Sequence, residues 1–172
     1  PEMSRGLGDV YKRQVRATTG VLVGKWYWEV LLVTDNSGGG LIFAGFEISS
    51  GPLDGFIGLL TDSAGIGNDN AVWIDGGTYG TDPGLWVAGT NICIAYDKPN
   101  AKMWLRINGG QWNGDSGSNN PAANQGGYDL SVIGAGTYMA AVTVSTTGDS
   151  VRAKFSPRDW SYAAPSGFVH FP

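Results

Sequence analysis

Residues 25–33 (KWYWEVLLV) constrain the fold of this chain more than any other stretch. Side chains alternate along a strand, which divides these residues between two faces. One face carries Trp26, Trp28, Val30 and Leu32, and the other carries Tyr27, Glu29, Leu31 and Val33. Both faces are largely apolar, which is typical of a central strand buried between two layers rather than of a solvent-exposed edge.

The rest of the chain continues in short strands separated by turn residues. Further strands are predicted at residues 41–47, 71–74, 90–96, 102–107, 138–145 and 150–155, the first of them returning antiparallel. Residues 109–136 are rich in Gly and Asn and are expected to form a loop that crosses the sheet. Because no apolar pattern with helical spacing persists, the sequence predicts an all-β fold, an antiparallel two-sheet β-sandwich.

The composition agrees with this class and excludes several others. The 172 residues include 28 Gly and 8 Pro, and 42% are hydrophobic, enough for one packed domain. A net charge of −4 argues against a nucleic-acid partner, which needs a basic face. No apolar run approaches the ~20 residues that span a bilayer, so we expect no membrane insertion. The single cysteine, Cys93, excludes an intrachain disulfide and a multi-cysteine zinc site.

Residues 1–14 (PEMSRGLGDVYKRQ) differ in character from the rest of the chain. They show no apolar periodicity, and residues 4–14 resemble one translated frame of a transposon-end adapter used in DNA sequencing libraries. A natural polar tail is the alternative. We therefore expect a non-native or disordered N-terminal segment over residues 1–14 and a domain over residues 15–172. The charged residues of this segment are Glu2, Arg5, Asp9, Lys12 and Arg13, and without them the net charge changes from −4 to −5.

Five motifs, in order, resemble those of SPRY domains. They are GKWYWEV at 24–30, LWV at 85–87 with NICIAYD at 91–97, KMWLRING at 102–109, YMAAVTV at 138–144 with GDSV at 148–151, and WSYAAPSGF at 160–168. Together they cover nearly all of residues 15–168. The resemblance implies a concanavalin-like β-sandwich of the jelly-roll type that acts as a binding module without a cofactor.

Three shorter segments are similar to those of SPRY-like modules encoded in phage and bacterial genomes: residues 15–18 (VRAT), 111–112 (QW) and 120–123 (NPAA). SPRY domains usually have a strand before the first of these segments. The resemblance therefore implies that the domain over residues 15–172 lacks its first strand and exposes an unpaired edge, which favours association.

The phage-type resemblance implies a module of a virion, tail-fibre or surface adhesion protein that recognises a glycan or a protein. Its place would be a virion or the extracellular space, and a homo-oligomer within a larger assembly fits this role. The alternative is a SPRY-type adaptor that binds short peptides through its loops. A polysaccharide-active enzyme is the third hypothesis.

His170 and Cys93 are weak candidates for catalysis. His170 lies near the C-terminus, where the chain is expected to fray rather than clamp a catalytic base. Cys93 lies within a strand, where a cysteine usually packs as a small buried side chain.

Glu29 and Glu47 could hydrolyse a glycosidic bond if their carboxylates lay ~5–10 Å apart. The paired-acid motif that jelly-roll glycosidases carry on one strand is absent. The structural alternative for Glu29 is a hydrogen bond or an ion pair with Arg16 or Lys25. We therefore expect no enzymatic activity.

The remaining candidates for function are aromatic residues with polar neighbours. Trp73, Asp75, Tyr79 and Trp112 are predicted to bind the ligand, because they lie in the two most irregular connections of a rigid scaffold. Trp86 and Trp104 match framework positions of the family. Residues 62–70 (DSAGIGNDN) and Asp75 lack the spaced acidic pattern of a calcium loop, so no metal site is expected.

Overall fold

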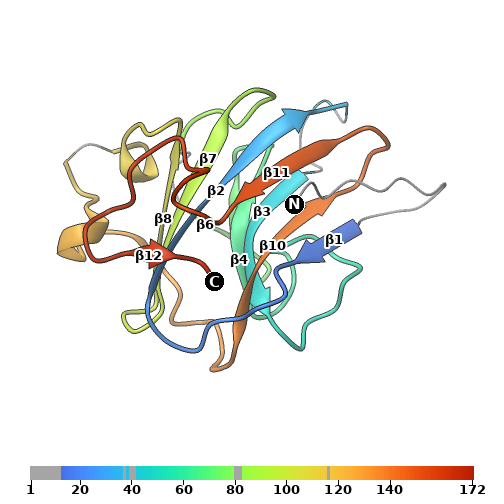
Figure 1. Cartoon of the computed structure of the whole chain (residues 1–172). Coiled ribbons are helices and arrows are strands. Elements are labelled where there is room, and N and C mark those ends of the chain that lie inside the picture. The colour runs from blue at the N-terminus through green and yellow to red at the C-terminus, as the bar shows by residue number, and fades with distance from the viewer. Residues whose placement is uncertain (1–12, 37, 39–41, 80–82, 116) are drawn as a thin grey trace.

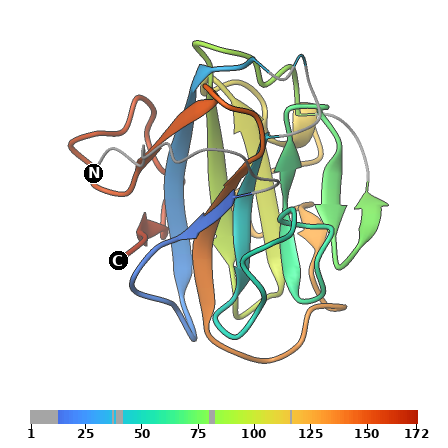
Figure 2. The ribbon, with the colours of Figure 1, turned by 90° about the vertical axis from the view of Figure 1, so that its right-hand side faces the viewer.

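The computed structural model describes residues 13–36, 38, 42–79, 83–115 and 117–172. Two sheets pack face to face, as Figures 1 and 2 show. Sheet A has the strand order β1-β10-β3-β4-β5-β6, and sheet B has the order β11-β2-β7-β8-β9. This arrangement confirms the predicted all-β, antiparallel two-sheet sandwich.

The strand bounds follow the predicted ranges closely where strands were expected. Sheet A consists of β1 (Arg13–Arg16), β10 (Tyr138–Val144), β3 (Ile42–Ile48), β4 (Ser63–Gly67), β5 (Val72–Ile74) and β6 (Gly77–Tyr79). Sheet B consists of β11 (Ser150–Lys154), β2 (Lys25–Thr34), β7 (Asn91–Asp97), β8 (Lys102–Ile107) and β9 (Tyr128–Asp129), and the short β12 (Val169–His170) runs parallel to β2. Two 3-10 turns, η1 (Trp112–Gly114) and η2 (Pro121–Ala123), lie between β8 and β9.

The core between the sheets is built from side chains that the alternation pattern assigned to it. Trp28 of β2 is buried there and packs edge-on against Phe46 and Phe171, with ring centroids 6.4 and 5.0 Å apart. Other buried residues of this core are Val30, Ile92, Ile94, Met103, Leu105, Val142 and Val151. Trp26 and Val144 pack against this core from partly exposed positions.

A second apolar layer covers the outer face of sheet B. Residues 156–168, here called the C-terminal strap, cross this face and place Trp160 edge-on against Tyr27, with ring centroids 4.7 Å apart. Cys93 and Trp104 are buried in the same layer. The strap explains why both faces of β2 are apolar, since each face packs against a separate layer.

The outer face of sheet A is covered by residues 49–62. Ile57 and Phe56 from this loop pack against Phe43 of β3. The loop lies so close to β4 that a Cβ on Gly65 would be 3.0 Å from Ile57 and 2.5 Å from the carbonyl oxygen of Ala44. Residues 62–70 were expected to be a loop, but they contain β4, whose small side chains conceal the strand pattern.

Two further expectations about connections were wrong. β3 does not return beside β2; it pairs with β10 and β4, so the chain passes from sheet B to sheet A between β2 and β3. The reason is that both edges of β2 are already occupied, by β7 on one side and by β11 and β12 on the other. Residues 109–136 are not a plain loop, because they include β9, which extends sheet B by pairing with β8.

The N-terminal boundary differs from the expected one by two residues. Arg13 and Gln14 were assigned to the segment before the domain, but they lie in β1, which pairs with β10 from Arg13 to Arg16. Residues 1–12 lie outside the described residues, so their expected disorder stays a prediction. Within the part of the chain that the structure describes, the other edge of β1 has no partner strand.

Candidate functional site

The β5–β6 hairpin holds three of the four predicted ligand-binding residues. Asp75 and Gly76 connect the two strands with φ values of +51° and +82°, as a type I′ turn requires. Trp73 lies in β5 and Tyr79 lies in β6. The Tyr79 ring lies over Gly77, since a Cβ on Gly77 would be 3.0 Å from it. Tyr79 thus points towards the turn, on the same face of the hairpin as its partner Val72.

Residues 49–62 brace this hairpin through backbone hydrogen bonds. The Gly76 N–H donates to the Gly58 carbonyl oxygen at 2.8 Å, and the Asp62 N–H donates to Asp75 Oδ1 at 2.9 Å. Asp62, like Asp75, has a left-handed backbone conformation, with φ of +56°. We call the β5–β6 hairpin, with its residues Trp73, Asp75 and Tyr79, together with Leu59 and Asp62 of the adjoining loop, the hairpin patch. Its exposed members include Leu59 (40% exposed) and Tyr79 (38% exposed).

Asp62 also ties the hairpin patch to the start of β10. Its Oδ1 accepts a hydrogen bond of 2.6 Å from the Gly134 N–H, and the Tyr138 hydroxyl donates to the Gly134 carbonyl oxygen at 2.6 Å. Burial raises the pKa of Tyr138 to about 12, and the charges of Asp62 and Asp75 add to this shift. The Lys98 ammonium group lies 4.1 Å from the centre of the Tyr138 ring, where it offsets part of the negative charge.

Trp73 and Tyr79 differ in their contacts. Trp73 is half-buried on the outer face of sheet A, where it packs against the cluster that contains Phe43 and Ile57. Among the described residues, its buried Nε1 has no hydrogen-bond partner. Tyr79 pairs with Val72, whose side chain enters the core, so Tyr79 and Trp73 lie on opposite faces of the hairpin and only the Tyr79 ring is exposed.

Trp112, the fourth predicted residue, lies apart from the hairpin patch. It belongs to η1 and packs against the layer on the outer face of sheet B, and the Arg106 guanidinium lies 4.2 Å from the centre of its ring. Trp73 packs on the outer face of sheet A. The structure places Trp73, Asp75 and Tyr79 on one hairpin, with Trp73 and Tyr79 on its two faces, and places Trp112 on the opposite side of the sandwich.

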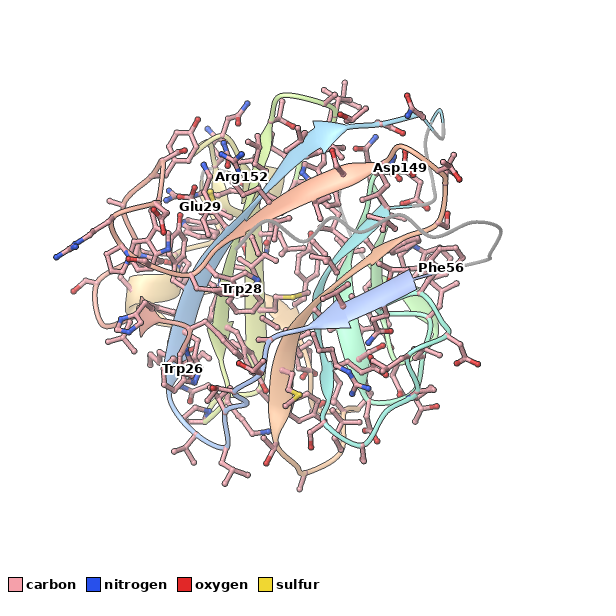
Figure 3. All side chains as sticks on the ribbon, turned by 45° about the vertical axis from the view of Figure 1, so that its right-hand side comes forward. Trp26, Trp28, Glu29, Phe56, Asp149 and Arg152 are labelled. Atoms are coloured by element: carbon pink, nitrogen blue, oxygen red, sulfur yellow. The ribbon has the colours of Figure 1, made fainter. Side chains whose placement is uncertain are left out.

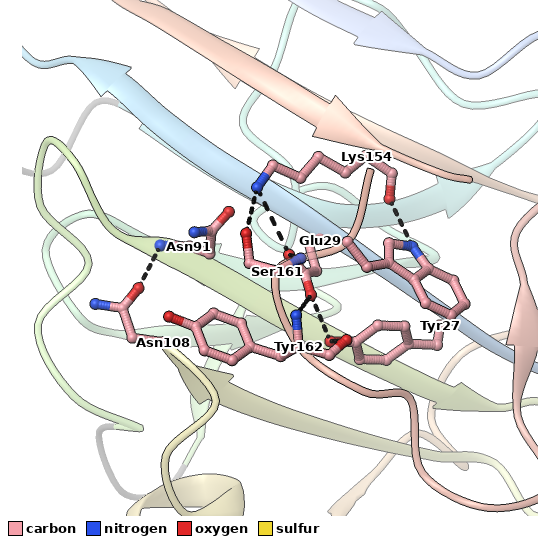
Figure 4. Close-up of polar contacts among 8 residues, drawn as sticks. Tyr27, Glu29, Asn91, Asn108, Lys154, Ser161 and Tyr162 are labelled. Carbon is pink, nitrogen blue, oxygen red and sulfur yellow. Dashed lines mark hydrogen bonds and ion pairs between the residues drawn. The ribbon is translucent and has the colours of Figure 1, made fainter. Parts of the chain in front are cut away.

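Glu29 is fully buried and fastens the C-terminal strap to sheet B (Figure 4). The backbone N–H groups of Ser161 and Tyr162 each donate to its carboxylate at 2.8 Å, and the Tyr27 hydroxyl donates at 2.9 Å. Burial, together with Cys93 and Glu29, raises the pKa of Tyr27, which keeps its hydroxyl protonated as a donor.

The basic partner of Glu29 is Lys154, at 3.8 Å, and not Arg16 or Lys25 as expected. Lys25 pairs with Asp97 at 2.8 Å, at the opposite end of β2 from the strap contact. Arg16 donates to the carbonyl oxygens of Ile48 and Gly51, on the other sheet.

Glu29 and Glu47 do not form a carboxylate pair. Glu29 points to the outer face of sheet B, beneath the strap. Glu47 alternates with the core residues Phe46 and Ile48 along β3, so it points to the outer face of sheet A. Figure 3 shows Glu29 on one side of the sandwich and Phe56, which covers the other outer face, on the opposite side. The core of the sandwich separates the two carboxylates.

Cys93 and His170 have ordinary structural surroundings. Cys93 is buried, and burial raises the pKa of its thiol, which disfavours the reactive thiolate. His170 is exposed in β12, where it pairs with Tyr27. The described residues contain no group of three or more side chains suited to hold a metal ion. Among them there is also no helix with the length and apolar character needed to cross a membrane.

Two residues of the site were not predicted from the sequence. Asp62 stood in the segment 62–70, which was considered only as a calcium loop, and Tyr138 stood at the start of a predicted strand. The contacts of Asp62 with Asp75 and Gly134, and of Tyr138 with Lys98, join residues more than ten positions apart, and local patterns carry no signal of such contacts. The tolerance of aspartate for positive φ was the only local sign available for Asp62.

Comparison with known proteins identifies the fold. A scan against protein-family models and a search of curated proteins found no match. The SPRY domain of human HERC1 matches with a TM-score of 0.66 and 18% identity, over 86% of this chain and 84% of that chain. A second human SPRY domain matches with a TM-score of 0.60 and 18% identity, over 86% of this chain and 87% of that chain. The chain therefore has a SPRY-like β-sandwich fold.

Proposed function

We propose that this chain is a non-enzymatic binding module that holds its partner at the hairpin patch. The observation that carries the proposal is the β5–β6 hairpin, which holds the exposed aromatic ring of Tyr79 and, in its turn, the carboxylate of Asp75 that the Asp62 N–H braces. An aromatic ring with polar neighbours on a rigid scaffold is the usual chemistry of a recognition surface. The hydrogen bonds from residues 49–62 and Gly134 keep this surface in place before binding, which lowers the entropy cost of association.

A protein segment is the first candidate for the partner. The SPRY-like fold and the motifs shared with SPRY domains support a protein-interaction module of this kind. Tyr79 and Leu59 would contact apolar side chains of the segment, and the carboxylate of Asp75 would accept hydrogen bonds from its backbone or its basic groups.

A glycan is the second candidate, favoured by an exposed ring and a carboxylate on the same hairpin. Sugars stack on aromatic rings and donate hydroxyl hydrogen bonds to carboxylates. This candidate agrees with the resemblance to phage-type modules, in which the chain would be part of a tail-fibre or surface adhesion protein. Assembly of several copies would then strengthen weak binding at each patch.

The positions of the acidic residues support a binding role over an enzymatic one. Glu29 and Glu47 are buried on opposite outer faces, so they do not share a substrate. Asp62 and Asp75 already accept backbone hydrogen bonds that hold loops together. A polysaccharide-active enzyme would require a carboxyl pair facing one cleft.

The proposal is tested by screening a peptide display library and a glycan array, and then titrating the best ligand by calorimetry. Tyr79→Ala and Asp75→Asn should each weaken binding by about 1–3 kcal/mol. Val169→Ala is the matched control, because Val169 is 52% exposed on β12 and lies on the other sheet. Unchanged affinity in both patch variants, combined with a loss in Trp112→Ala, would place the site on the outer face of sheet B instead. Release of products from a polysaccharide by the wild-type protein would contradict the non-enzymatic role.

A further inference from the structure

A buried polar pair joins the edge strand β1 to β3. Gln14 Nε2 donates a hydrogen bond to Glu47 Oε2, and both side chains lie inside the protein, with Gln14 7% exposed and Glu47 fully buried. The two remaining oxygens of the pair, Gln14 Oε1 and Glu47 Oε1, are buried and have no hydrogen-bond partner among the residues that the structure describes. The backbone of the 49–62 loop encloses the carboxyl group, because a Cβ on Gly51 would overlap with Glu47 Oε1.

These contacts suit a neutral carboxylic acid better than a carboxylate. A buried carboxylate is stabilised by several donors, whereas Glu47 receives one, from Gln14. A protonated Glu47 brings one O–H donor of its own, and Gln14 brings a carbonyl oxygen that lacks a donor. Protonation therefore gives an acid–amide pair in which each group both donates and accepts, after a rotation of the amide if needed.

The charged groups near Glu47 do not reverse its preference for the neutral, protonated form. Arg16 of β1 is the cation that acts on Glu47, but its guanidinium donates to the carbonyl oxygens of Ile48 and Gly51. On the neighbouring strands, Glu47 lies opposite Met139 of β10 and Ser63 of β4, neither of which carries a charge. Burial raises the pKa of Glu47 to about 7, against the smaller opposing effect of Arg16.

We propose that Gln14 and Glu47 form a proton-dependent latch that holds β1 on the edge of sheet A while Glu47 is neutral. Ionisation of Glu47 leaves a buried charge with one donor, and the strand that carries Gln14 is the element free to move, since β1 pairs with β10 along one edge. Release of β1 uncovers the edge of β10. It also opens the apolar crevice that Val15 lines together with Val142 and Phe155.

The direction of the pH dependence follows from linkage. In the unfolded or released state the pKa of a glutamate is ~4.3, below that of the latched state. The stabilisation from the latch is therefore complete below about pH 4 and is lost as the pH rises through about 7. Acidic conditions should thus favour a docked β1, and the shift towards a released β1 should reach its full extent by about pH 7.

Hydrogen exchange of the full chain, followed by mass spectrometry, tests the latch. Wild type and Glu47→Gln are compared at the same pH values, from about pH 4.5 to about pH 8.5, so that the intrinsic rate of exchange cancels. Between about pH 5 and about pH 7, protection of the peptide containing β1 should fall in the wild type by up to about tenfold per pH unit relative to Glu47→Gln, and above about pH 7 this difference should level off. A peptide from β7 is the internal control and should keep the same protection in both proteins. Equal behaviour of β1 in the two proteins would overturn the proposal.

A measurement on the wild type keeps the proposal testable if the variant does not fold. The chain has three glutamates, Glu2, Glu29 and Glu47, so their side-chain carboxyl carbons can be resolved by NMR. The Glu47 signal should titrate near neutral pH, together with shifts of the β1 amide signals. A midpoint in the ordinary acidic range, or a neutral midpoint without any change in β1, would contradict the latch.

Discussion

Glu29 shows how one residue can determine the position of a whole segment. Its carboxylate accepts hydrogen bonds from two consecutive backbone N–H groups of the C-terminal strap, at Ser161 and Tyr162. These groups lie more than 130 residues away in the chain, beside Lys154 of the neighbouring strand. The strap in turn covers the apolar layer that contains Tyr27, so the contacts of Glu29 protect that layer from water.

Replacing Glu29 by Gln should destabilise the protein by about 2–4 kcal/mol. The amide group has one acceptor oxygen in place of two, and its NH₂ would face donors that now bind the carboxylate. The change is measured by urea unfolding. Asp159→Asn, an exposed change in the same strap, should stay within about 0.5 kcal/mol of wild type. Equal stability of the two variants would show that Glu29 does not fasten the strap.

Trp73 and Tyr79 belong to one hairpin but should respond differently to substitution. Trp73→Ala should lower the free energy of unfolding by about 2–4 kcal/mol, because the indole packs on Phe43 and Ile57. Tyr79→Ala should cost less than about 1 kcal/mol, because its ring is exposed beside Gly77. Thermal unfolding of both variants checks this order. The reverse order would mean that Tyr79 supports the fold and Trp73 is the residue available to a ligand.

At the scale of elements, the sequence predicted strands where large side chains alternate. β2, β7, β8, β10 and β11 begin and end within about two residues of the predicted ranges, because each carries a long alternating pattern. β4 was missed because Ser63, Gly65 and Gly67 carry too little side chain to show the alternation. β6, β9 and β12 have two or three residues each, too few to show a period.

The candidate site could be predicted in part for the same reason. The sequence placed Trp73, Asp75 and Tyr79 in one irregular connection, and the structure shows that this stretch forms a hairpin around the Asp75-Gly76 turn. The grouping of Trp112 with these three residues depended on how two long connections fold, and the sequence pattern does not predict this. Asp62 was missed because its contacts with Asp75 and Gly134 form only after sheet A and its loops have assembled.

Deletion of terminal residues should separate the expendable segment from β1. Removal of residues 1–12 should leave the thermal midpoint within about one or two degrees of wild type. Removal of residues 1–16 should lower it by about 5 °C or more, because it takes away the pairing of β1 with β10 and the buried side chain of Gln14. A large drop on removing residues 1–12 alone would show that the segment contributes to the folded domain.

At the scale of the whole molecule, both outer faces of the sandwich are already covered. The C-terminal strap lies on sheet B, and residues 49–62 lie on sheet A. A partner that leaves the fold intact would therefore meet the hairpins, the loop ends or the open edge of β1 rather than a sheet face. Among these surfaces, the hairpin patch combines an exposed ring with carboxylates that are fixed by hydrogen bonds.

The most direct test of binding at the hairpin patch is to map the bound ligand by NMR. Amide signals of the labelled protein are followed during titration with the best ligand from the peptide and glycan screens. We expect the largest shifts at Leu59, Asp62, Asp75 and Tyr79, with little change at Trp112, Tyr162 and Val169. Shifts concentrated at the C-terminal strap and Trp112, with the signals of the β5–β6 hairpin unchanged, would contradict binding at this patch.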